Sequence, residues 1–156
     1  MPHREYVSVL SPGSFDAVLP APRTQAGSPF TGADADLKGY DSAFADFIIG
    51  APGIAFDATN KIRLSAEEAD DDGSGAGTGW SAVAALDLVW RQAGAELGQL
   101  ASVDIDAGAK ASRSYQAAYL GKKRHFRPVI QFLGTHGTGT SCAAKVFRAH
   151  KTELNR

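Results

Sequence analysis

The sequence has a single cysteine, Cys142, so the chain can form no internal disulfide and no zinc site built from cysteine pairs. Its neighbours Ala143 and Ala144 are small and apolar, and we therefore expect Cys142 to be a core residue rather than a reactive thiol.

No apolar run approaches the roughly 18 residues that a membrane-spanning helix needs. Met1–Tyr6 is not followed by the apolar stretch of a signal peptide. We expect a soluble protein, folded in a cytosol, with no membrane partner.

Motifs for catalysis or for a cofactor are also lacking. The four histidines show no metal-ligand spacing, and no nucleophile elbow occurs. The acidic run Glu67–Gly73 is the best candidate for a calcium site, but it lacks the EF-hand spacing, and a solvated turn is the preferred interpretation. Gly134–Thr140 lacks the Gly-Lys-Ser/Thr ending and the following helix of a phosphate-binding loop, which favours a wide turn. We expect no enzymatic activity, no metal and no cofactor.

The composition favours short strands joined by turns. Hydrophobic residues make up 44% of the 156 residues, enough for a real core. The 17 glycines and 7 prolines exceed what a helical bundle tolerates. A chain of this length suits one domain, or one domain with an arm.

Alternation of polar and apolar residues predicts a series of strands. The expected strands are Ala43–Ile49, Lys61–Glu67, Trp80–Ala84, Ala101–Asp106, Ser114–Leu120, His125–Leu133 and Ser141–Ala149, while Leu86–Trp90 is a short apolar run that is left unassigned. Short turns join the last three, which predicts an antiparallel meander. For Gln92–Leu100, a helical turn and a loop remain open. The spacing indicates an all-β fold, an antiparallel β-sandwich of jelly-roll or immunoglobulin-like form.

The same alternation predicts the core of that sandwich. The inward residues are expected to include Phe47, Ile49, Ile62, Leu64, Val83, Tyr119, Phe132 and Val146. Trp80 and Trp90 have apolar neighbours and are assigned to the core, the alternative being an exposed aromatic pair that grips a sugar. Pro128 cannot donate to a ladder and is expected at an edge or a bulge.

Residues 1–41 differ from the rest of the chain, since they hold five of the seven prolines. We expect an extended, proline-rich arm here and a β-sandwich domain over residues 42–156. The arm keeps two apolar clusters, which pack either on the flank of its own domain or on a neighbouring subunit. If the arm binds a neighbouring molecule, we expect its contact residues to be Arg4, Tyr6, Val7, Val9, Leu10, Phe15, Val18 and Leu19.

Charge is distributed unevenly along the chain. Residues 110–156 hold ten Lys/Arg and one acid, a net charge of +9, whereas residues 1–109 hold six Lys/Arg and sixteen acids, a net charge of −10. The preferred interpretation is that basic strands pair with acidic ones within a sheet. An extended charged contact with another protein is the alternative. Direct nucleic-acid binding is disfavoured because the overall charge is near zero.

Three stretches together resemble a family of small structural proteins encoded in the head-gene region of tailed bacteriophages and prophages. They are Asn60–Gly73 followed by Gly79–Val83, then Tyr119–Arg127, then Phe132–Thr140. The likeness covers roughly residues 55–150, and the third stretch matches best. This chain departs from the family pattern at Ala69, at Lys122 and in the inserted segment Ser74–Thr78.

The resemblance implies a structural virion protein that decorates and cements the phage head, made in the bacterial cytoplasm and located on the capsid surface. The implied partners are the major capsid protein and neighbouring copies of this chain, with a trimer as the favoured homo-oligomer. Two alternatives remain: a tail or head–tail joining protein, and a carbohydrate-binding β-sandwich for host attachment.

Overall fold

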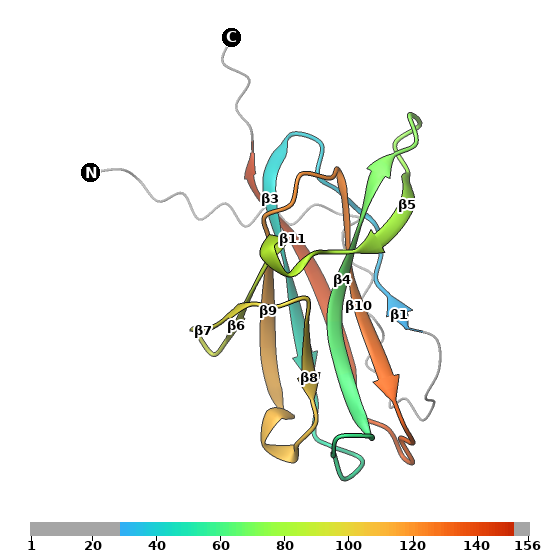
Figure 1. Cartoon of the computed structure of the whole chain (residues 1–156), viewed down its shortest axis with the longest axis vertical. Helices are drawn as coiled ribbons and strands as arrows, with labels where there is room; N and C mark the ends of the chain where they lie inside the picture. The colour runs from blue at the N-terminus through green and yellow to red at the C-terminus, as the bar shows by residue number, and fades with distance from the viewer. Residues whose placement is uncertain (1–28, 152–156) are drawn as a thin grey trace, which may run out of the picture.

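The computed structural model describes residues 29–151, which form two antiparallel β-sheets packed face to face (Figure 1). The predicted all-β sandwich is therefore confirmed. Among these residues, no helix is long and apolar enough to cross a lipid bilayer.

The first sheet is built around two long strands, β4 (Lys61–Asp71) and β10 (His125–Leu133). Four shorter strands flank this pair: β1 (Phe30–Thr31) and β2 (Ala35–Asp36) on β10, β5 (Gly77–Ala82) and β8 (Ser102–Ile105) on β4. Each outer edge of the central pair is thus shared by two short strands.

The second sheet has five strands in the order β11-β3-β9-β6-β7. They are β11 (Cys142–Lys151), β3 (Tyr40–Ile49), β9 (Arg113–Tyr119), β6 (Leu88–Gln92) and β7 (Ala95–Gln99). Two short 3-10 turns, η1 (Ala85–Asp87) and η2 (Gly108–Lys110), precede β6 and β9.

The core lies between the two sheets, and alternation along each strand fills it. In β3, Ala43, Ala45, Phe47 and Ile49 face inward and are buried, while Ile48 on the other face is exposed. All eight core residues predicted from the sequence are buried. Trp90 is also buried and packs against Phe47.

The predicted meander of the last three strands is wrong. β9 and β11 both belong to the second sheet, where they flank β3, whereas β10 belongs to the first. The loops between these strands therefore carry the chain from one layer to the other. Alternation shows that one face of a strand is buried, but it does not identify the neighbouring strand.

Gln92–Leu100, left open between a helical turn and a loop, is mainly a strand. β7 pairs with β6 through a tight hairpin whose central residues, Ala93 and Gly94, have φ of 49° and 83°. Such a turn needs two positive φ angles and is usually signalled by Asn-Gly or Asp-Gly. Because Ala93 occupies the first position of the turn in place of Asn or Asp, the sequence did not indicate a hairpin here.

Pro128 lies in β10, an inner strand, rather than at an edge or a bulge. Its carbonyl accepts a hydrogen bond from the Gly32 N–H at 2.8 Å, in the gap between β1 and β2. The nitrogen and the carbonyl of one strand residue point to the same side. The missing N–H therefore faces this gap and removes no bond from the ladder with β4.

The described part of the predicted arm, residues 29–41, takes part in the sandwich. β1 and β2 pair with β10, Phe30 packs edge-on against Phe132, and Ala35 and Leu37 are buried. Residues 1–28, including all eight proposed contact residues from Arg4 to Leu19, lie outside the described residues. For them, the arm remains a prediction.

We predict that Leu64→Ala lowers the free energy of unfolding by about 2–5 kcal/mol, because Leu64 is completely buried and its removal leaves a cavity. Its neighbour Arg63 points outward and pairs with Asp104 at 2.8 and 3.0 Å near the surface. Arg63→Ala should therefore cost only about 1 kcal/mol or less. Urea unfolding of the two variants checks both values, and equal losses would contradict the strand register.

Candidate functional site

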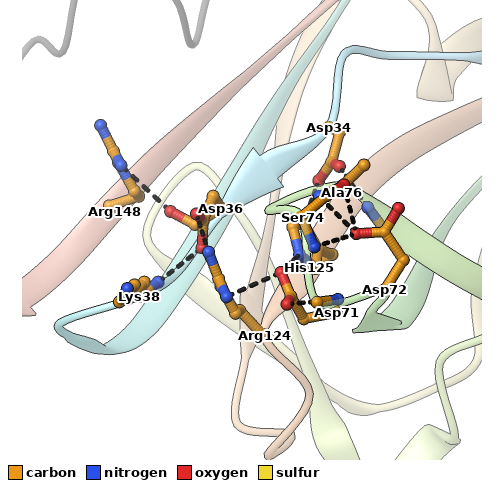
Figure 2. A network of polar contacts seen from close by, with 12 residues as sticks. Asp34, Asp36, Lys38, Asp71, Asp72, Ser74, Ala76, Arg124, His125 and Arg148 are labelled. Atoms are coloured by element: carbon orange, nitrogen blue, oxygen red, sulfur yellow. Dashed lines mark hydrogen bonds and ion pairs between the residues drawn. The ribbon is translucent and has the colours of Figure 1, made fainter.

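One end of β10 carries the densest set of charged contacts in the described part of the chain. His125 begins this strand and Arg124 directly precedes it, Asp34 and Asp36 come from the segment around β2, and Asp71 ends β4 (Figure 2). We call these five residues the polar cluster. Strand register brings them together: His125 pairs with Asp36 on one side and with Ala69 on the other.

His125 is fully buried at the centre of the polar cluster. Its Nδ1 lies 2.8 Å from Asp34 Oδ1, and its Nε2 lies 3.2 Å from Asp71 Oδ2. A protonated imidazole can donate to both carboxylates, whereas a neutral one can donate to only one. Burial lowers the pKa of His125, but the two carboxylates outweigh it, so the net shift is upward.

Arg124 holds two carboxylates of the polar cluster at once. Its Nε and Nη2 donate to the two oxygens of Asp36, both at 2.7 Å, and its Nη1 lies 2.7 Å from Asp71 Oδ2. The hydrogen bonds from Arg124 lower the pKa of Asp36 to about 2. Bonds from His125 and the charge of Arg124 also lower the pKa of Asp71. Asp36 and Asp71 therefore remain ionised at lower pH than an ordinary aspartate does.

The β4–β5 hairpin closes over His125. The Trp80 ring meets the imidazole edge-on, and a Cβ at Gly77 would lie 3.1 Å from the His125 Cβ. Arg127 covers the other side of Trp80, with its guanidinium carbon 3.9 Å from the ring centroid, and also pairs with Glu67 at 2.6 Å. Trp80 is thus half-buried beneath an arginine, unlike the buried Trp90.

Tyr119 connects the two sheets beside the polar cluster. Its hydroxyl donates to Glu68 Oε2 at 2.6 Å and accepts the Lys123 N–H at 3.0 Å, while its ring stacks on Phe126. Burial and the Glu68 carboxylate raise the pKa of Tyr119. The residue is therefore a neutral link between β9 in one sheet and β4 in the other.

The arrangement ties strands together through matched charges. Both ring nitrogens of His125 and the whole guanidinium fork of Arg124 are engaged by carboxylates. In the described part of the chain, no three His, Cys, Asp or Glu residues are placed to hold a metal ion. Cys142 is buried, as predicted, and burial raises the pKa of its thiol to about 12.

The two loops considered as ligand sites have structural partners. In the acidic run, Asp70 pairs with Lys123, and Asp72 accepts the N–H groups of Ser74 and Ala76 in the turn. The glycine-threonine loop is a wide turn that ties β10 and β11 to the segment after β3. The bonds that anchor it run from the Thr138 hydroxyl to the Gly53 carbonyl and from the Thr135 N–H to Asn60 Oδ1.

Sequence reasoning missed the polar cluster itself. The charge asymmetry predicted that basic strands pair with acidic ones, and the ion pairs of Arg127 with Glu67 and of Arg124 with Asp71 agree with that prediction. The partners of His125, however, lie 91 and 54 positions away in the chain. Two aspartates on alternate positions, Asp34 and Asp36, were the only local signal.

Comparison of the chain with protein-family models, with curated proteins and with solved structures finds no match.

We predict that the polar cluster makes stability depend on pH in two directions. The folded-state pKa of His125 lies above its unfolded value near 6.5, so its contribution is fully present below about pH 6.5 and is lost as pH rises through the folded-state pKa. The lowered pKa values of Asp36 and Asp71 act oppositely. Their contribution is present above about pH 4 and is lost as pH falls through the folded-state values.

Urea unfolding of the native protein and of His125→Gln across this pH range measures the first effect. The difference in the free energy of unfolding between the two proteins should shrink as pH rises. Asp34→Asn, which keeps the imidazole in place, should reduce the same pH dependence. Parallel pH profiles for the native protein and His125→Gln would show that folding does not shift the pKa of His125, and would contradict this prediction.

Proposed function

We propose that the chain is a structural virion protein that decorates and stabilises the head of a tailed bacteriophage by binding the lattice of the major capsid protein. The observation that carries this proposal is the meeting, mainly within the first sheet and its loops, of the three stretches that resemble the phage head-gene family. In this role the protein needs no catalytic group and no cofactor.

The stretches contact one another through their most distinctive residues. Glu67 from the first stretch pairs with Arg127 from the second, and Arg127 covers Trp80. Asn60, at the start of the first stretch, accepts the Thr135 N–H of the third. The motif residues are thus used to hold β4, β5 and β10 together, which is what a rigid building block requires.

Polar contacts hold strands or loops together at both ends of the sandwich. The polar cluster and Tyr119 hold one end, while the bonds of Asn60 and Thr138 hold the loops at the other. A domain braced in this way suits a protein that resists deformation of a shell. Contacts that are weak individually become strong when a symmetric lattice repeats them.

Exposed leucines offer one surface for such contacts. Leu86, Leu97, Leu100 and Leu120 lie around η1 and the β6–β7 hairpin, with exposed fractions of 40–73%. The Leu120 N–H bonds to the Asp87 carbonyl, and the Gln99 side chain bonds to the Leu86 carbonyl, so these segments adjoin. Apolar patches of this kind commonly mark protein–protein contacts.

The alternative roles differ in their support. A sugar-binding role would favour an exposed aromatic pair, but Arg127 covers Trp80 and Trp90 is buried. A tail or head–tail joining role draws on the same resemblance and the same rigid domain. Copy number separates it from decoration, since a joining protein forms one ring at a single vertex.

We predict that the purified protein binds heads assembled from the major capsid protein of its phage and raises the temperature at which they break open, because a ligand of the assembled state stabilises it. Quantitative mass spectrometry of saturated heads should give a copy number comparable with that of the capsid protein. Binding limited to a single ring, or no binding, would contradict decoration.

We predict that deleting residues 1–28 leaves the sandwich folded but sharply weakens binding to heads, since this segment carries the two apolar clusters and Pro2, Pro12, Pro20 and Pro22. The cut precedes Phe30 because that ring packs against Phe132. Circular dichroism monitors the fold, and co-sedimentation with heads measures binding. Unchanged binding, or loss of the fold, would refute an intermolecular arm.

A further inference from the structure

A partly open pocket of about 360 Å³ lies at the same end of the sandwich as the polar cluster. Its walls are two turns, the one that joins β2 to β3 and the one that joins β9 to β10. The Leu37 N–H donates to the Arg124 carbonyl at 2.7 Å and fastens the turns to each other. Pockets of this size accept a small ligand or a few side chains of a partner.

Positive charge dominates the lining of the pocket. Four cationic side chains, Lys38, Lys122, Lys123 and Arg124, face a single carboxylate, Asp41, which gives a formal charge of +3. Among the described residues, Lys38 and Lys122 form no ion pair with a side chain. Lys123 pairs at 3.2 Å with Asp70, whose side chain is 71% exposed, and an exposed pair of this kind is easily exchanged for another.

Arg124 lines the pocket, but its guanidinium is not available to bind a ligand. Asp36 and Asp71 already engage its guanidinium, as Figure 2 shows. The groups available to a ligand are therefore three ammonium ions on flexible stems. Ammonium groups act as point charges and do not impose the planar geometry of an arginine fork.

The backbone around the pocket is poorly suited to phosphate. Phosphate sites commonly use free N–H groups arranged as a nest or at a helix N-terminus. Here the N–H groups of Lys38, Tyr40 and Lys123 are taken by Asp36 Oδ1, the Leu37 carbonyl and the Tyr119 hydroxyl. These three N–H groups are therefore not available to a bound anion, and the flexible ammonium groups provide the main attraction.

We infer that this pocket binds an acidic peptide segment, whose Asp or Glu side chains pair with Lys38, Lys122 and Lys123. Leu37 and Tyr40 also line the pocket and supply apolar surface. On the proposed function, the segment belongs to the major capsid protein. Contacts of this type speed association and align partners, and added salt weakens them.

The test uses the full chain and a fluorescent hexaglutamate peptide as the probe. Fluorescence anisotropy should detect binding that weakens as sodium chloride is added. The double variant Lys38→Glu/Lys122→Glu should bind the peptide about tenfold more weakly or worse. Arg91→Glu/Lys110→Glu, which changes net charge equally at exposed sites away from the pocket, should bind within about twofold of the native protein.

Equal losses of peptide affinity in both double variants would show that the peptide responds to net charge alone, and would refute the pocket as its binding site. Displacement of the peptide by inorganic phosphate, beyond the effect of sodium chloride at equal ionic strength, would also overturn it in favour of a phosphate site. Binding of the pocket variant to heads separates the two proposals. If the native protein binds the peptide but not heads, the decoration role is refuted and the peptide-binding pocket still stands. If the pocket variant binds heads as well as the native protein does, the capsid segment is not the ligand of the pocket.

Discussion

The pairing of β4 with β10 is the interaction on which the rest of this structure depends. Nine residue pairs, from His125 opposite Ala69 to Leu133 opposite Lys61, align the two longest strands of the first sheet. The four short strands of the first sheet attach to this pair, and Pro128 is accommodated because its missing donor faces the gap between β1 and β2. Opposite charges across the ladder, such as Glu67 and Arg127, favour this register over a slipped one.

The same pairing places a buried histidine between carboxylates at the start of β10. Burying His125 is costly unless its charge is matched, and Asp34 and Asp71 match it from two different segments. Such a network depends on all of its members, because removing one leaves another charge buried and unpaired. The polar cluster therefore joins the segment around β2 to the end of β4 more specifically than apolar contact alone would.

Two features of the described domain and one segment before it are proposed as contact regions. The basic pocket lies beside the polar cluster, the exposed leucines lie around the β6–β7 hairpin, and residues 1–28 precede β1 in the chain. Rigidity matters for binding, since a preorganised surface loses little conformational freedom on association. In the decoration role, one rigid domain would present several modest contacts to a repeating lattice, with the charged contact providing alignment.

The sequence by itself determined most of the longer strands and which of their residues face the core, because side chains alternate along any strand whatever its neighbours; Leu64 and Val146 were identified in this way. It also predicted the pairing of acidic with basic strands, since charge is a property of composition. Only the tertiary structure decided that β9 and β10 lie in different sheets, because alternation carries no information about the adjacent strand. It alone assembled the polar cluster, whose residues are far apart in the chain and meet when β2 and β4 pair with β10, and the basic pocket, whose two turns meet in the folded chain.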